Sequence, residues 1–291
     1  GMGGGLVGGL QQFRREVWVL TARSLKHHWR NASEIRNGFM RVLAATALLG
    51  LLAWGEGGRL QADLIDTDTG MVDRHAYNVS SLVYAVVAGL LVAAGVGIPY
   101  VHSAAQVLKF EVVSGLQSAG GCWLSLLLVE TTLFLMGTSA VGIILPLMSS
   151  LHPPLSLLPP LLLYALCCHS LSLACAVWCR HLRTATLLYT SLSLSGLFFA
   201  GYLQTLPALG FWRFFGVFTR WGFESMSWVY FASAPDRDAY MHYYGFGGNG
   251  DSTGWLALWA WGLQCLVFLG FIPQQFRVKF TTQGKIDRGL R

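Results

Sequence analysis

Residues Tyr77–Val101 form a run of 25 residues without a charged side chain, and this run restricts the fold more than any other feature. A helix needs about 20 mainly apolar residues to cross the ~30 Å hydrocarbon core of a bilayer. Five more runs are long and mainly apolar: Asn37–Trp54, Gly121–Ser149, Leu155–Cys179, Thr184–Leu203 and Thr253–Pro273. The sequence therefore predicts an all-α integral membrane protein with six transmembrane helices.

The composition points the same way. Only 12% of the residues are charged and 54% are hydrophobic, whereas a soluble domain carries about 25% charged residues. The 20 Lys and Arg residues lie between the apolar runs and do not form one stripe, so we expect no nucleic-acid partner. All six cysteines fall inside apolar runs, which favours buried small side chains over a disulfide framework.

The positions of the basic residues predict how the chain crosses the membrane. Fifteen of the 20 lie in segments 1–41, 102–120, 180–183 and 274–291, and nine of the 14 acidic residues lie on the opposite side. Loops rich in Lys and Arg stay in the cytoplasm. Both termini are therefore predicted to be cytoplasmic.

The segment before the first span is expected to form an amphipathic connecting helix over residues 11–36, after a glycine-rich terminus or linker at 1–10. Phe13, Val17 and Leu20 fall roughly on one side of this helix, with basic residues elsewhere. Such a helix lies along a membrane surface, with its basic side chains near anionic headgroups.

The remaining chain divides into a six-span domain at 37–273 and a basic cytoplasmic tail at 274–291. Between spans five and six lies the external segment 204–252, which is rich in Phe and Trp. Aromatic rings of this kind prefer the membrane interface. We therefore expect the external segment to be re-entrant.

The sequence contains no motif for a catalytic site. Of the four lysines, only Lys285 follows a glycine, and Ile286 stands where a P-loop needs Ser or Thr. Cys168, Cys175 and Cys179 share one side of a helix, but small residues at helix contacts explain this better than a metal site. We expect neither a metal nor a cofactor on this chain.

Three polar residues are expected to have structural roles. Glu130 is the one acid deep in a predicted span, and a hydrogen-bonded structural acid is favoured over a proton relay because no second embedded acid accompanies it. Arg220 and Glu224 are four residues apart, so in a helix they would form an ion pair that pins the external segment.

Three segments carry a resemblance to a known family. They are Gln12–Asn31, the stretch Phe110-Glu111-x3-Gly115-Leu116-x-Ser118, and Ser195–Glu224, which includes Leu206-Pro207 and Arg220-Trp221-Gly222-Phe223-Glu224. In this order they resemble the connecting helix, the coupling stretch, and the fifth span with its re-entrant segment in G-subfamily (ABC-2 type) ATP-binding-cassette half-transporters. The resemblance is to the membrane domain of that group, which includes eye-pigment, sterol and multidrug exporters.

The chain also departs from the family pattern. Phe110 replaces the Arg before the coupling Glu, Gln117 replaces the usual Tyr, and Val229-Tyr230 replace an Asn-Glu pair. The nucleotide-binding domain is not in this sequence. It is expected upstream, on a partner chain, or not at all.

The resemblance implies where the functional residues lie. Glu111, Gly115 and Ser118 would couple the chain to a nucleotide-binding domain, which would hold ATP and Mg²⁺. Family members are dimers, and their second and fifth spans line a central cavity. The substrate path would then involve Tyr84, Ser191, Ser195, Phe198, Phe199 and Leu206.

Two functions follow as hypotheses. In the first, the chain pairs with a second half-transporter, identical or different, and moves a lipophilic, sterol-like small molecule across the bilayer. In the alternative, it is a transport-inactive structural subunit of a larger membrane complex. The role of the fifth span also stays open, because its serines could bond their own helix while its phenylalanines face lipid.

Overall fold

A computed structural model describes residues 3–30, 46–52, 54, 72, 74–114, 118–150, 154–212, 217–232, 234, 237–246 and 252–289. Every multi-residue element in these ranges is a helix. The helices are α1 (Gly3–Arg30), α3 (Arg74–Gly95), α4 (Gly97–Val113), α5 (Ala119–Met148), the 3-10 helix η2 (Pro154–Leu157), α6 (Leu158–Trp178), α7 (Leu182–Phe198), α8 (Leu206–Leu209), α9 (Val217–Tyr230), α10 (Arg237–Tyr244) and α11 (Ser252–Gly289). Residues 46–52 are also helical.

Four helical stretches of the described chain are long and apolar enough to cross a bilayer: Arg74–Ala104, Gly120–Met148, Leu155–Trp178 and Ser252–Gly270. They correspond to the second, third, fourth and sixth predicted spans. Helix α7, at 17 residues, is about 25 Å long at 1.5 Å per residue, a few Å less than the hydrocarbon core. The first predicted span lies mostly outside the described residues, so the count of six spans stays a prediction.

Several element boundaries differ from those expected. Helix α1 begins at Gly3 and so includes most of the glycine-rich stretch. Its expected continuation at 31–36 lies outside the described residues. Helix α11 runs to Gly289, so the predicted tail continues the sixth span as helix.

The second span is interrupted toward its C-terminal end. A turn at Val96 separates α3 from α4, and Gly95, Gly97 and Pro99 stand around it. Glycine weakens a helix, and proline removes one backbone N–H donor. Helix α4 then continues to Val113, beyond the predicted end of the span at Val101.

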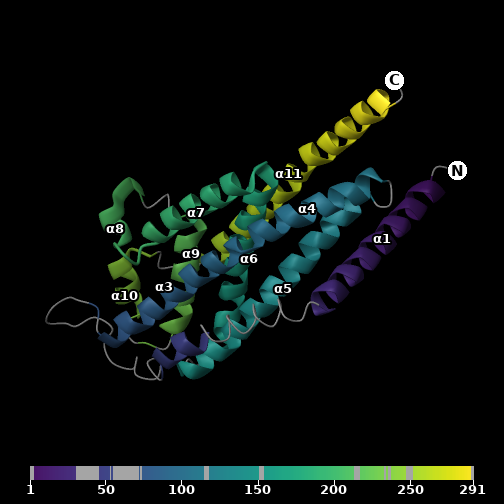
Figure 1. Cartoon of the computed structure of the whole chain (residues 1–291). Coiled ribbons are helices and arrows are strands. Elements are labelled where there is room, and N and C mark those ends of the chain that lie inside the picture. The colour runs from purple at the N-terminus through teal and green to yellow at the C-terminus, as the bar shows by residue number, and fades with distance from the viewer. Residues whose placement is uncertain are drawn as a thin grey trace.

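Helix α6 lies at the centre of the molecule and packs against α3, α4, α5, α7, α9 and α11 (Figure 1). Hydroxyl groups tie α3 to its neighbours. Tyr164 of α6 donates to the Val87 carbonyl at 3.1 Å, and Ser172 of α6 donates to the Ala94 carbonyl at 2.7 Å. In lipid, bonds of this kind supplement the apolar packing that holds helices together.

The last helix is tied to α6 by three polar contacts. Cys167 donates to the Leu256 carbonyl at 3.4 Å, Gln264 donates to the Ser170 hydroxyl at 2.8 Å, and the Trp178 indole donates to the Leu266 carbonyl at 3.1 Å. The contacts lie at successive levels along α11, so they fix its register against α6.

The start of α1 and the end of α11 lie at the same end of the molecule, and α8 and α10 lie at the opposite end (Figure 1). Helix α9 packs against α3, α6, α7 and α11. This arrangement suits the predicted topology, in which the termini share one side. The orientation and the re-entrant path of the external segment stay predictions.

Candidate functional site

Helix α7 carries three of the six residues predicted to line a substrate path, and it contacts the rest of the chain through a narrow face. Its buried residues are Ala185, Tyr189 and Gly196. Tyr189 donates to the Leu91 carbonyl of α3 at 2.5 Å, and Gly196 lets Thr219 of α9 approach closely. The other sides of α7 are largely exposed.

Ser191, Ser195 and Phe198 share the face of α7 opposite its buried residues, because they are four and three positions apart. Ser191 is exposed, and the Phe198 side chain is 58% exposed. Ser195 donates to the Leu192 carbonyl at 2.9 Å, so this serine does bond its own helix. The face thus combines hydroxyl groups with a large aromatic ring.

The chain beyond α7 extends this face with aromatic rings. Phe199 stacks on Trp212, with ring centroids 5.8 Å apart, and Trp212 is 56% exposed. Phe211 beside it is also exposed. Leu206, by contrast, is buried against Gly201 and Gly245, so it belongs to the core beneath the exposed rings.

Tyr84 joins α3 to the end of α7 within one chain. Its hydroxyl donates to the Leu197 carbonyl at 3.3 Å. Its ring stacks on Tyr202 at 4.5 Å between centroids and meets the edge of Phe223 at 6.3 Å. Tyr84 is half-buried in this cluster, so it borders the exposed face and does not form its centre.

The α4–α5 turn, predicted to contact an ATP-binding domain, is held by α1. Arg23 Nη2 of α1 donates to both carboxylate oxygens of Glu111 at 3.0 Å. Glu16 of α1 accepts the backbone N–H of Ser118 at 2.6 Å. Ser118 in turn caps α5 by accepting the Gly121 N–H at 3.1 Å.

These contacts bring Glu111 and Ser118 to one junction, and Gly115 lies outside the described residues. The sequence analysis did not predict that Glu16 would bind the start of α5. The signal was present, because Glu16 is the only acidic residue in the basic stretch 11–30. A single carboxylate among these basic residues indicates a specific hydrogen-bond partner elsewhere in the chain. In the structure this partner is the backbone N–H of Ser118 at the start of α5.

The residues predicted to be structural lie on α5 and α9, and of the three only Glu224 is fully buried. Arg220 Nε lies 3.8 Å from Glu224 Oε2 on α9, and the Glu224 side chain is only 2% exposed. The Arg220 guanidinium also lies over the Trp221 ring, 4.5 Å from its centroid. Glu130 is partly buried on α5. Among the described residues, no group of three or more His, Cys, Asp or Glu side chains is placed to hold a metal ion.

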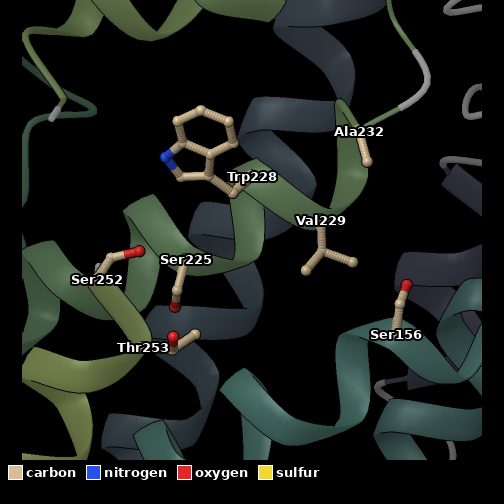
Figure 2. A pocket seen from close by; sticks show the side chains of 7 residues that line it. All are labelled: Ser156, Ser225, Trp228, Val229, Ala232, Ser252 and Thr253. Carbon is tan, nitrogen blue, oxygen red and sulfur yellow. The ribbon is translucent and has the colours of Figure 1, made fainter. Parts of the chain in front are cut away.

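A cavity of about 270 Å³ lies where α9, η2 and the start of α11 meet (Figure 2). Its walls are mostly apolar, with hydroxyl groups among them. The lining residues are Ser156, Ser225, Trp228, Val229, Ala232, Ser252 and Thr253. Sequence reasoning did not find this cavity, because its lining comes from three segments far apart in the chain.

The sequence model of the ABC-2 type transporter family matches residues 15–231, about three quarters of the chain. No curated protein matches the chain. The matched region runs from the middle of α1 through α9, and it includes the α4–α5 turn and the exposed face of α7. The chain therefore belongs to the ABC-2 type transporter family and is an integral, multi-pass membrane protein.

Proposed function

We propose that this chain is the membrane half of an exporter that moves a lipophilic small molecule, with ATP hydrolysis supplied by a separate nucleotide-binding domain. Membership of the ABC-2 type family supports a transporter component. The G-type assignment rests on the resemblance of the connecting helix, the coupling stretch and the fifth span. The substrate class rests on the chemistry of the α7 face.

The observation that carries the proposal is the exposed face of α7. This helix is buried within the chain at Ala185, Tyr189 and Gly196, yet its opposite face presents Ser191 together with Phe198. Hydroxyl groups on transmembrane helices usually face other helices or cavities, because lipid offers them no partner. A second copy or a second half-transporter on this face would enclose a mostly apolar slot.

Such a slot suits a flat, lipophilic substrate. Apolar and aromatic walls supply the contact area, and a few hydroxyls fix the orientation of a molecule with one or two polar groups. Phe198 and the stacked pair Phe199–Trp212 provide rings at one end. Ser191 provides a hydroxyl between the rings and the other end of the helix.

The α4–α5 turn is the proposed contact for the ATP-binding domain. Because Arg23 and Glu16 tie this turn to α1, a force applied there would move α1, α4 and α5 together. Glu111 is then a link within the junction as well as a contact residue for the partner, and its carboxylate is engaged by Arg23.

The first test is the composition of the native particle, purified in mild detergent. The proposal expects a nucleotide-binding domain in the particle, together with ATPase activity that vanadate inhibits and lipophilic compounds alter. A particle of other membrane subunits that lacks any ATP-binding domain would refute transport and favour the structural-subunit alternative.

The second test addresses the α7 face directly. Ser191→Trp should fill the slot and abolish stimulation of the ATPase by lipophilic compounds, while basal activity persists. Ala257→Trp is the matched control, since Ala257 is exposed on α11, and it should behave as the unmodified protein. Equal stimulation in both variants would exclude the α7 face as the substrate path.

A further inference from the structure

Helix α1 lies along α5 at the edge of the molecule (Figure 1). The apolar side predicted from its sequence, which includes Val17 and Leu20, is turned toward the protein. Val17 is half-buried there, and Leu20 is only 6% exposed. The opposite side of α1, called here its outward side, therefore meets the surroundings. Trp18 stands on the outward side and is 73% exposed.

Two arginines accompany Trp18 on the outward side. Arg14 and Arg15 are four and three positions before it, so the three side chains are neighbours on the helix surface, and both arginines are exposed. None of the ion pairs within the described residues involves Arg14 or Arg15. The one acid in this part of α1, Glu16, is held on the other side by the Ser118 N–H. The outward side thus presents two unpaired positive charges.

The bond between Glu16 and Ser118 fixes the level of these residues in the membrane. Ser118 lies two residues before the span Gly120–Met148, so Glu16 is at the membrane–water boundary. At 1.5 Å per residue, Arg14 and Trp18 are each about 3 Å from Glu16 along the helix axis. Because the start of α1 lies at the outer end of the molecule (Figure 1), the two arginines are on the water side of the Trp18 ring.

This order of groups matches the order of groups in an anionic phospholipid. Indole rings prefer the headgroup level of a bilayer, and a guanidinium donates parallel hydrogen bonds to phosphate oxygens. Two positive charges at this level favour lipids with a net negative charge over zwitterionic ones. A free phosphate ion would leave the Trp18 ring without a contact, so a lipid satisfies more of the surface than a soluble anion does.

We infer that the outward side of α1 binds an anionic phospholipid of the leaflet on the side of the chain termini. The headgroup phosphate lies at Arg14 and Arg15, and the start of an acyl chain lies against the Trp18 ring. None of these residues belongs to the α7 face or to the α4–α5 turn, so the inference does not depend on the proposed transport.

The test is native mass spectrometry of the full chain, stripped of lipid in mild detergent and titrated with phosphatidylserine or phosphatidylcholine. Tighter binding of phosphatidylserine is expected. Arg14→Gln combined with Arg15→Gln should weaken phosphatidylserine binding about tenfold. The matched control is Arg180→Gln combined with Arg183→Gln, which removes the same charge from exposed positions where α6 and α7 meet. It should weaken that binding much less.

Two further variants separate the contributions of charge and ring. Arg14→Lys combined with Arg15→Lys keeps the charge and should keep the preference for phosphatidylserine. Trp18→Ala should weaken the binding of both lipids about two- to tenfold, whereas Trp261→Ala, at a residue that is 71% exposed on α11, should not.

Three results would each overturn the inference. The first is equal binding of the two lipids by the unmodified protein, which would leave the outward side to a protein partner. The second is an equal loss in the two glutamine variants, which would mean that only the net charge of the chain attracts the lipid. The third is displacement of phosphatidylserine by an equimolar amount of inorganic phosphate, which would make a soluble anion the occupant.

Discussion

At Gly222 the absence of a side chain lets α9 lie directly on the central helix. A Cβ at this position would collide with the Tyr164 ring of α6. Tyr164 is fully buried and its hydroxyl is bonded to the Val87 carbonyl, so the ring has little room to move aside.

We predict that Gly222→Ala destabilises the protein by about 1–3 kcal/mol, the usual cost of overpacking a core. The control is Gly262→Ala in α11, where an added Cβ meets nothing within 4 Å and the higher helix propensity of Ala should be neutral or slightly stabilising. Thermal unfolding in detergent measures both. A similar midpoint for the two variants would mean that the α6–α9 contact is looser than described.

The start of α5 depends on two residues that are 102 positions apart in the chain. Ser118 caps the helix through the Gly121 N–H, and Glu16 places a carboxylate on the Ser118 N–H, where the positive end of the helix dipole favours negative charge.

We predict that Ser118→Ala costs about 1 kcal/mol, as loss of an N-cap usually does, and that Glu16→Gln has a smaller effect. Hydrogen exchange should accelerate in the first turn of α5 in both variants. Ser114→Ala serves as the control, because its exposed hydroxyl bonds only within its own turn. Unchanged protection at residues 118–122 would show that α1 does not cap α5.

At the scale of the element, α10 is a short helix held by tyrosines. The Tyr240 ring packs on Phe231 with 4.1 Å between centroids, and its hydroxyl lies 2.5 Å from the Ser80 hydroxyl of α3. Burial raises the pKa of Tyr240 well above its ordinary value, and the neighbouring Tyr244 raises it further. The folded protein therefore keeps this phenol protonated.

The sign of the pH dependence follows from that shift. Unfolded tyrosine has a pKa of about 10, so the contribution of Tyr240 to stability is complete below pH 10 and falls as the pH rises above it. We predict that the unfolding midpoint drops above about pH 10, and that it drops less in Tyr240→Phe. An equal drop in both proteins would mean that other groups cause the alkaline loss.

At the scale of the whole molecule, the start of α1 and the end of α11 lie at the same end (Figure 1). We predict that protease removes an N-terminal and a C-terminal tag from the same face of sealed vesicles, and that this is the cytoplasmic face because it carries fifteen of the 20 basic residues. A tag inserted after Asp238 should be protected. Removal of the two terminal tags from opposite faces would exclude an even number of spans.

The sequence predicted the spans well because crossing a bilayer requires only length and apolarity. Four predicted spans coincide with long apolar helices, and the break at Val96 follows from nearby glycine and proline. The predicted pairing of Arg220 with Glu224 is present because a helix alone brings positions four apart together.

Contacts between distant segments were harder to predict. The pair Arg23–Glu111 joins residues 88 positions apart. The sequence around an arginine does not indicate which distant carboxylate it will bind. The burial of Leu206 depends on Gly245 lying beside it. The cavity beside α9 likewise exists only because α9, η2 and α11 converge.

The contacts between α6 and α11 have a consequence for biogenesis. During synthesis α6 enters the membrane well before α11 leaves the ribosome, and until then the Ser170 hydroxyl, the Cys167 thiol and the Trp178 indole lack their partners on α11. The nascent chain thus exposes to lipid a face of α6 that α11 later covers. Truncation before residue 252 would leave that face without its partner helix.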